Sequence, residues 1–458
     1  MSLSNQRGRW IWTAVLVGGT IYSAVHFALS GVREPLRWPN VGQVIEEESL
    51  AVQAYLAHGR PVEIKNRRQY GPTYFFIAET LLRRCGTDLR RLSHWLYGIQ
   101  LVCFSLAFLF TVLSLRLWSQ RAWPRARGEP LPFWQWLALL SFLWLNFAPA
   151  YYIMAIKNVE MWELCLIAAG LYCYLRRWRL ACGFLIAAAA LTKMLPAIFL
   201  FYFLIRDRRQ LLYCSVGCFV ILTISHLRYG PQMGYLYLPF ILKATVGNTW
   251  ALICYENVSA KGMLVKFFGH WKMEQPNYVT AISPQGLVIA NVLGHGIEIM
   301  GMIWVVWTLV SSAAEKHPQW EPHRPIWEWS FMSIVLFILS PHAGFDYMVL
   351  ALIAFSVVLA ALVWDAQLRE DRVLVTCFGA AVVLIANVVP RQAINRLLPI
   401  AFLNRVSGNA HLTLSEGYQY FGFPLLGMLC MLAALWRFRN RFHAHESRVE
   451  IPVAMSPT

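Results

Sequence analysis

Long uninterrupted apolar stretches constrain this chain more than any other feature of its sequence. Residues 10–31 ("WIWTAVLVGGTIYSAVHFALSG") and 101–118 ("LVCFSLAFLFTVLSLRLW") each approach the roughly 20 residues that a helix needs to cross the hydrocarbon core of a membrane. Similar segments follow along the rest of the chain. We therefore expect an all-α polytopic membrane protein.

The composition agrees with that class. Of the 458 residues, 58% are hydrophobic and 14% are charged, whereas a soluble domain carries about 25% charged residues. No long polar stretch separates the apolar segments, so residues 1–458 are expected to form a single integral membrane domain. The formal net charge of +16 does not indicate a nucleic-acid partner, because arginine beside apolar segments is typical of cytoplasmic loops.

The apolar segments predict about twelve transmembrane helices, some of them short enough to be tilted or broken. They lie near 10–30, 95–119, 133–153, 158–175, 179–192, 194–206, 210–228, 285–310, 326–341, 346–366, 372–390 and 419–436. The stretch "KMLP" between the fifth and sixth segments predicts a helix break, which membrane proteins tolerate where protein or a cavity satisfies the freed backbone groups.

Arginine-rich connections predict the orientation. They fall on one side of the alternating spans, which places the N-terminus (1–9) and the tail (437–458) in the cytoplasm. The expected location is the inner or plasma membrane of the cell. The opposite side then holds three long segments, 31–94, 229–284 and 391–418. Long loops in compact proteins are usually functional, so we expect the function on the non-cytoplasmic face.

The first of these loops is expected to be ordered and to bind an anion. Apolar residues recur at three- and four-residue steps in 41–59 and 72–86, which predicts two helices lying along the membrane surface. Basic residues are frequent in the loop although they have no topogenic use there, and Arg67 and Arg68 suit the phosphate of an anionic lipid. An anionic lipid headgroup is therefore a natural partner of this loop.

Glu46, Glu47 and Glu48 form a run of acid in a chain where acid is scarce. A solvated helix start is one explanation, and a catalytic base at the membrane surface is the other. Successive residues on a helix point about 100° apart, so at most one or two of the three face the core. A carboxylate beside a phosphate-binding cluster can act as general base, and the spacing to Gly59 favours the first two.

Ionisable residues inside apolar segments are candidates for function because they are costly to place in a membrane. Lys193 adjoins the predicted break and could meet a phosphate, although a lysine that reaches up to the membrane surface is an equal alternative. Glu160 shares a helix face with Glu163, where the two acids could stabilise a helix N-terminus or bind substrate. His342 and Asp346 suit a metal, proton transfer, a sugar hydroxyl or a helix cap.

Some functional classes have no support in the sequence. No glycine-rich phosphate loop and no convincing metal-ligand cluster occur, so neither a cofactor nor a metal is expected. Tyr70 lies in one of several aromatic stretches, which an interfacial belt explains first and stacking on a sugar second.

Four runs occur in an order that resembles glycosyltransferase family 87. They are "QYGPTYFFIAETLL", "RRWRLACGFLIAAAALTKMLP", "ENVSAKGML" and "LSPHAGFDYMVL", of which the second is the most specific. The resemblance extends from about residue 45 to 365. This family belongs to the GT-C superfamily and includes the mannosyltransferases of phosphatidylinositol mannoside assembly.

The resemblance implies a GT-C-type transmembrane fold and a polyprenyl-phosphate sugar donor, commonly of mannose. It implies inverting transfer to a lipid or glycan acceptor on the non-cytoplasmic face. The base falls on the run of three glutamates, although the family more often has aspartate there. The departing phosphate is held by Lys193 and the loop arginines, while the acceptor or sugar is expected to contact residues of the matching runs and Glu160. Those residues are Tyr70, Asn257, His342 and Asp346.

Two other functions remain open from the sequence. A transporter or flippase of a lipid-linked or anionic substrate would also use broken helices and intramembrane charge, but it should show two related halves, which we do not find. An O-antigen ligase or polymerase would share the large outer loops and arginines but use a diphosphate-linked donor.

Overall fold

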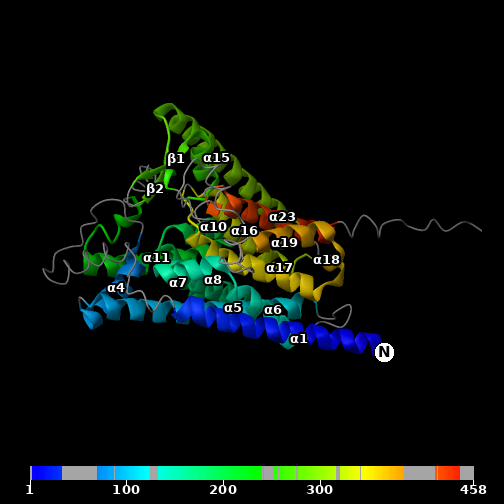
Figure 1. Cartoon of the computed structure of the whole chain (residues 1–458). Coiled ribbons are helices and arrows are strands. Elements are labelled where there is room, and N and C mark those ends of the chain that lie inside the picture. Colours follow the sequence, from blue (N-terminus) through cyan, green and yellow to red (C-terminus); the bar gives the residue numbers. More distant parts are fainter. Residues whose placement is uncertain are drawn as a thin grey trace, which may run out of the picture.

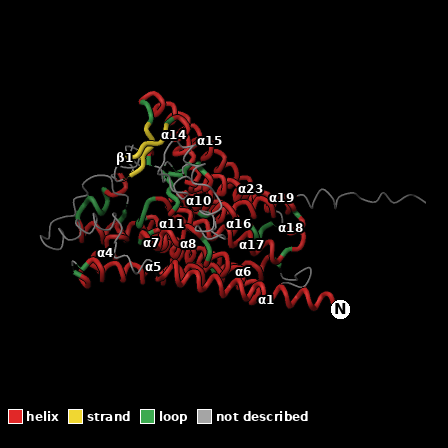
Figure 2. The backbone as a smooth tube through the Cα atoms, in the orientation of Figure 1, coloured by secondary structure: helices red, strands yellow, loops and turns green. Residues whose placement is uncertain are grey.

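The computed structural model describes residues 3–33, 70–86, 88–123, 133–239, 241, 252–254, 257–274, 277–315, 320–340, 342–385, 418–419 and 421–443. The chain forms an elongated bundle of helices with a small pair of strands near one end (Figures 1 and 2). The N-terminal half contributes α1 (Leu3–His26), the π-helix η1 (Phe27–Arg33), α4 (Pro72–Cys85), α5 (Leu89–Ala122), α6 (Phe133–Leu145), α7 (Ala148–Ile156), α8 (Glu160–Leu175), α9 (Arg179–Ala190), the 3₁₀ turn η2 (Leu195–Ala197), α10 (Ile198–Arg206) and α11 (Arg208–Tyr229). The C-terminal half contributes α14 (Ala260–Phe268), β1 (His270–Glu274), β2 (Asn277–Ala281), α15 (Pro284–Ala314), α16 (Arg324–Leu339), the 3₁₀ helix η3 (Asp346–Ala351), α17 (Leu352–Trp364), α18 (Ala366–Glu370), α19 (Arg372–Ile385) and α23 (Phe423–His443).

Each of the twelve predicted spans contains a helix in the described part of the chain. By length and apolar composition, four helical stretches are suited to cross a membrane, namely Arg90–Ala122, Arg208–Tyr229, Pro284–Ala314 and Asp346–Trp364. A fifth results if α6 and α7, which are bent by 49° relative to each other, count as one span. These helices make a multi-pass membrane protein, while the total of about twelve crossings stays a prediction.

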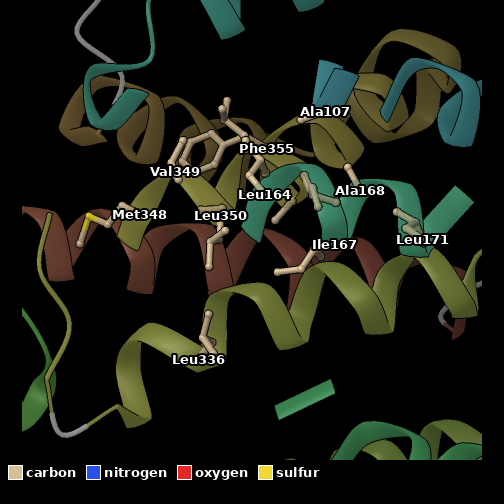
Figure 3. Close-up of a cluster of buried hydrophobic side chains, with 14 of the residues drawn as sticks. Ala107, Leu164, Ile167, Ala168, Leu171, Leu336, Met348, Val349, Leu350 and Phe355 are labelled. Atoms are coloured by element: carbon tan, nitrogen blue, oxygen red, sulfur yellow. The ribbon is translucent and has the colours of Figure 1, made fainter. Parts of the chain in front are cut away.

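The centre of the bundle is formed by α8, α16 and α17, which are buried on nearly all sides. Figure 3 shows part of this core, with Leu164, Ile167, Ala168 and Leu171 of α8 beside Leu336 of α16 and Met348, Val349, Leu350 and Phe355 of η3 and α17. A helix that is apolar all round belongs inside a membrane bundle. By contrast, α11 and α15 expose many large apolar side chains, as lipid-facing helices do.

The all-α expectation needs one correction, because β1 and β2 form an antiparallel hairpin inside the long segment 229–284. His270 pairs with Ala281 at one end of the hairpin, and Glu274 pairs with Asn277 at the other. Aromatic and β-branched residues are enriched in these two short runs, "HWKME" and "NYVTA", which favours strands over helix. The hairpin and α4 lie toward the same end of the bundle, opposite α18 and the N-terminus (Figure 1).

Helix α4 confirms one of the two helices expected in the first long loop, whereas residues 41–59 lie outside the described residues. Glu79 attaches α4 to the end of α11. Its carboxylate accepts hydrogen bonds from Arg83 Nε at 2.8 Å, from Arg228 Nε and Nη2 at 2.8 Å each, and from the Tyr229 hydroxyl at 2.6 Å. Burial alone would raise the pKa of Glu79, but these hydrogen bonds outweigh it and lower the pKa to about 2.

We predict that Glu79→Gln loosens the attachment of α4. The free energy of unfolding should fall by about 1–2 kcal/mol, less than the full pKa shift implies because Arg83 and Arg228 are half exposed. A lowered pKa stabilises the fold above the unfolded-state value near 4.5, and this contribution is lost as the pH falls from there toward 2. The melting temperature of the purified protein is measured at pH 7 and at pH 4. It should fall less between these two pH values in Glu79→Gln than in the unmodified protein. An equal fall in the two proteins would contradict the stabilising role of the Glu79 carboxylate.

Candidate functional site

The predicted helix break is present and is held by the start of the first loop's helix. Helix α9 ends at Ala190, and η2 does not begin until Leu195. Within this gap, the Gly71 N–H donates to the carbonyl of Thr192 at 2.8 Å, and the Thr73 N–H donates to that of Leu191 at 3.1 Å. Tyr70 and Lys193 pair as an isolated antiparallel bridge. Backbone groups freed by the break are therefore satisfied by a segment more than a hundred residues away in sequence.

Gly71 makes this close approach possible. A Cβ atom at this position would lie 2.1 Å from the carbonyl oxygen of Leu191 and 2.8 Å from the hydroxyl of Tyr237. Since the nearest obstacle is backbone, no larger residue fits without moving the break. Pro72 follows in the first turn of α4, where the N–H that proline lacks has no helical partner to lose.

Lys193 is buried and paired. Its Nζ lies 2.5 Å from Oε1 of Glu160, the first residue of α8, and the two residues are 5% and 0% exposed. The same Nζ lies 4.0 Å from the ring centroid of Tyr347 and 5.2 Å from that of Tyr70. A buried ammonium needs a counter-charge, and aromatic faces add further attraction. Lys193 is therefore not a lysine that reaches the membrane surface.

Asn158 connects the elements around this ion pair. Its Oδ1 accepts from the Tyr70 hydroxyl at 2.5 Å, and its Nδ2 donates to Oδ2 of Asp346 at 3.1 Å. Its carbonyl accepts from Nε2 of Gln100 on α5 at 2.7 Å. The Asn158 side chain thus hydrogen-bonds to Tyr70 at the end of the first loop and to Asp346, the first residue of η3, although Asn158 and Asp346 are 188 positions apart.

The segment before η3 is tied down by Asn257. This side chain is fully buried, and its Oδ1 accepts from the backbone N–H of Ser259 at 3.1 Å and of Ala343 at 3.2 Å. Asn257 therefore holds the backbone next to His342, whose ring lies 6.2 Å from that of Tyr347. Asp346 folds against Gly344, where a Cβ atom would lie 2.1 Å from the carboxylate.

The interior of the site has a surplus of hydrogen-bond acceptors. Glu163 is fully buried and neither of its carboxylate oxygens has a partner among the described residues. The same holds for Oε2 of Glu160 and Oε1 of Gln100. Carboxyl and amide oxygens can accept hydrogen bonds, and donors such as water or sugar hydroxyls would satisfy them.

The structure brings together four of the predicted site residues and places two others beside them. Tyr70, Glu160, Lys193 and Asp346 form the cluster, and Asn257 and His342 belong to the adjoining backbone. The base candidates Glu46, Glu47 and Glu48 and the phosphate candidates Arg67 and Arg68 lie outside the described residues, so their roles stay predictions. No group of three or more His, Cys, Asp or Glu side chains in the described ranges is placed to hold a metal ion.

Three residues of the cluster were not among the candidates from sequence. Gln100 is an isolated polar residue in the apolar run "YGIQLVCF", which is a usable signal for a buried contact. Asn158 lies in the connection "IKNVE", where its long-range partners leave no local trace. Tyr347 lies in the run "LSPHAGFDYMVL", and its ring contact with Lys193 is visible only in the structure.

We predict that removing Lys193 alone destabilises the fold more than removing the charges of both Lys193 and Glu160. Lys193→Met leaves the Glu160 carboxylate buried without its counter-charge and should cost about 3–5 kcal/mol. Combining it with Glu160→Gln removes both charges and should recover much of that loss. Thermal unfolding of the single and double variants in detergent measures the coupling, and strictly additive losses would show that the pair is not formed.

Comparison with known proteins places the chain in a family. A search of the curated proteins finds no match. Among solved structures, the crystal structure of ArnT from Cupriavidus metallidurans bound to undecaprenyl phosphate is similar, with 18% sequence identity, coverage of 95% of this chain and 80% of that one, and a TM-score of 0.37. The profile of glycosyltransferase family 87 matches residues 91–321, which is half of the chain and includes Gln100, Asn158, Glu160, Lys193 and Asn257. The chain belongs to glycosyltransferase family 87.

Proposed function

We propose that this protein transfers a sugar, with mannose as the first candidate, from a polyprenyl-phosphate donor to a lipid or glycan acceptor with inversion at the anomeric carbon. The observation that carries the proposal is the buried Lys193–Glu160 pair at a helix break, joined through Tyr70 and Asn158 to Asp346 in a chain of family 87. It combines a cation suited to a phosphate with carboxylates suited to hydroxyl groups.

The proposed reaction takes place on the non-cytoplasmic face. Helix α8 begins at Glu160 in the site and runs for 16 residues, so its other end is about 24 Å away. Arginines collect at the ends and turns remote from the site, as the positive-inside rule expects of cytoplasmic loops. They include Arg176, Arg177, Arg179, Arg206, Arg208, Arg209, Arg369 and Arg372.

Lys193 is assigned to the donor phosphate. An ammonium group has three N–H donors, and Glu160 takes one of them. A phosphate that approaches from the side of Tyr70 can accept another while Glu160 keeps the lysine charged and oriented. Arg67 and Arg68 are proposed to complete the phosphate site from the first loop. The negative charge that develops on the departing polyprenyl phosphate is then stabilised before it leaves.

The transfer itself needs one base. The acceptor oxygen attacks the anomeric carbon, the bond from that carbon to the phosphate oxygen breaks, and the bonding electrons leave with the polyprenyl phosphate. The acceptor proton passes to a carboxylate of the Glu46–Glu48 run. A phosphate leaving group does not need protonation, so this chemistry does not require the paired acids of glycosidases.

Recognition of the sugar and acceptor is assigned to the acids and the adjoining segment. Asp346 and Tyr70 are oriented by Asn158, and Glu160 keeps one carboxylate oxygen for a hydroxyl donor. Asn257 is assigned an indirect part in this recognition, because it holds the backbone beside His342.

We predict that one of Glu46→Gln, Glu47→Gln and Glu48→Gln lowers transfer by on the order of 10²–10⁴-fold, because it removes the general base. The assay follows radiolabelled sugar from polyprenyl-phosphate-mannose, and from the glucose analogue in parallel, into a lipid acceptor by purified protein in detergent. The unaffected glutamates and Glu370→Gln, an exposed acid on α18 at the far end, are matched controls.

Full activity in all three variants would overturn the base assignment. Preference for another sugar would change the donor while leaving the reaction class intact. Binding of the donor without any transfer by the unmodified protein would contradict the transferase and favour a carrier of lipid-linked sugar.

A further inference from the structure

A polar triad interrupts the apolar face of α15. The helix exposes large apolar side chains such as Val292 and Ile299, and between them lies His295 with 57% of its side chain exposed. Nδ1 of His295 is 2.8 Å from Oε2 of Glu298, and its Nε2 is 3.3 Å from Nζ of Lys261 on α14. Ionisable side chains facing lipid are expensive unless they meet polar partners, so the triad requires an explanation.

The contacts define the direction of the hydrogen bonds. An ammonium group only donates, so Nε2 of His295 accepts from Lys261, and Nδ1 therefore carries the proton that is donated to Glu298. Lys261 is 5% exposed because α14 packs closely on α15: a Cβ atom at Gly294 would lie 2.6 Å from its Cγ. With a neutral imidazole, the triad carries no net charge.

The depth of the triad points to lipid headgroups. Helix α15 has 31 residues and is about 46 Å long, whereas the hydrocarbon core is about 30 Å thick and takes roughly 20 residues. At its far end, the helix stops at Ala314, beside the ion pair between Glu315 and Arg439. If Ala314 marks one boundary of the hydrocarbon, counting 20 residues back reaches His295, which we therefore assign to the boundary between hydrocarbon and headgroups at the site end of the bundle.

We propose that Lys261, His295 and Glu298 bind the phosphate of an anionic phosphodiester lipid in the leaflet next to the active site. A phosphate oxygen replaces Nε2 as the acceptor for Lys261. Binding takes up one proton from the buffered solution onto Nε2 of the imidazole, and this Nε2–H donates to the phosphate while Nδ1–H stays on Glu298. The triad thereby reaches a charge of +1, which matches the single negative charge of the phosphodiester.

The chemistry around the imidazole is consistent with this exchange. Among the described residues, the charged groups in contact with His295 are Lys261 from α14 and Glu298 on its own helix. Glu298 contacts the imidazole at Nδ1 and not at Nε2, the nitrogen that faces Lys261. A protonated imidazole held by a carboxylate on one side is free to donate on the other.

The lipid site is structurally connected to the candidate active site without being part of it. Helix α14 begins at Ala260 and is capped by Ser259, and the N–H of the preceding Val258 donates to the carbonyl of Ala343 at 2.8 Å. A lipid bound by Lys261 therefore rests on the element that fixes the segment around His342. The proposal concerns binding alone and does not depend on which sugar is transferred.

The test measures binding of a fluorescent phosphatidylglycerol to purified protein in neutral detergent. Lys261→Met and His295→Gln should each weaken binding by about tenfold or more, because each removes a charge-assisted hydrogen bond. The double variant should lose less than the product of the single losses, since both groups hold one phosphate. Diacylglycerol, which has the acyl chains without the phosphate, should not compete.

Matched controls separate this site from general effects. Lys266→Met removes the other buried lysine of α14, which donates to the Gln419 carbonyl, and His94→Gln removes an exposed histidine of α5. Neither should change lipid affinity. Unchanged binding in His295→Gln, or an equal loss in Lys266→Met, would overturn the proposal. Competition by inorganic phosphate as effective as that by unlabelled phosphatidylglycerol would also overturn it, because it would indicate a site for the free ion.

Discussion

An ammonium group buried at the break between two membrane helices needs a counter-charge, and the pairing of Lys193 with Glu160 supplies it. The rest of the site depends on this contact. Lys193 lies in the gap that follows the end of α9, and this break frees backbone groups that Gly71 and Thr73 satisfy. The ion pair, the broken helix and the docked first loop are therefore one structural unit.

The polar groups of this unit are divided in a way that suits a sugar phosphate. Lys193 is a pure donor at the break, whereas the carboxyl oxygens of Glu163, Oε1 of Gln100 and Oε2 of Glu160 have no partner among the described residues. A sugar phosphate has acceptors at its phosphate and donors at its hydroxyls. A site with a lysine donor and unpartnered acceptor oxygens is thus suited to the donor headgroup, while Asn158 links the Tyr70 side to Asp346.

Sequence reasoning recovered the parts of this arrangement that leave a local signal. The apolar segments predicted the helices, the proline after Lys193 predicted the break, and scarce charge in apolar surroundings singled out Lys193, Glu160 and Asp346. The hairpin β1–β2 was missed because two strands of five residues are too short to compete with the helical character of their surroundings. The partners of Lys193 and Asn158 were missed because contacts between residues 33 and 188 positions apart depend on how the helices pack, which one sequence does not encode locally.

A structure of the protein with polyprenyl phosphate bound would test the central claim most directly. We expect a phosphate oxygen within hydrogen-bonding distance of Lys193 Nζ, on the Tyr70 side, with Glu160 still in contact with the lysine and Glu46, Glu47 or Glu48 facing the space where the acceptor would attack. A phosphate bound elsewhere on the bundle, with Lys193 enclosed between Glu160 and Tyr347 and out of its reach, would contradict the account.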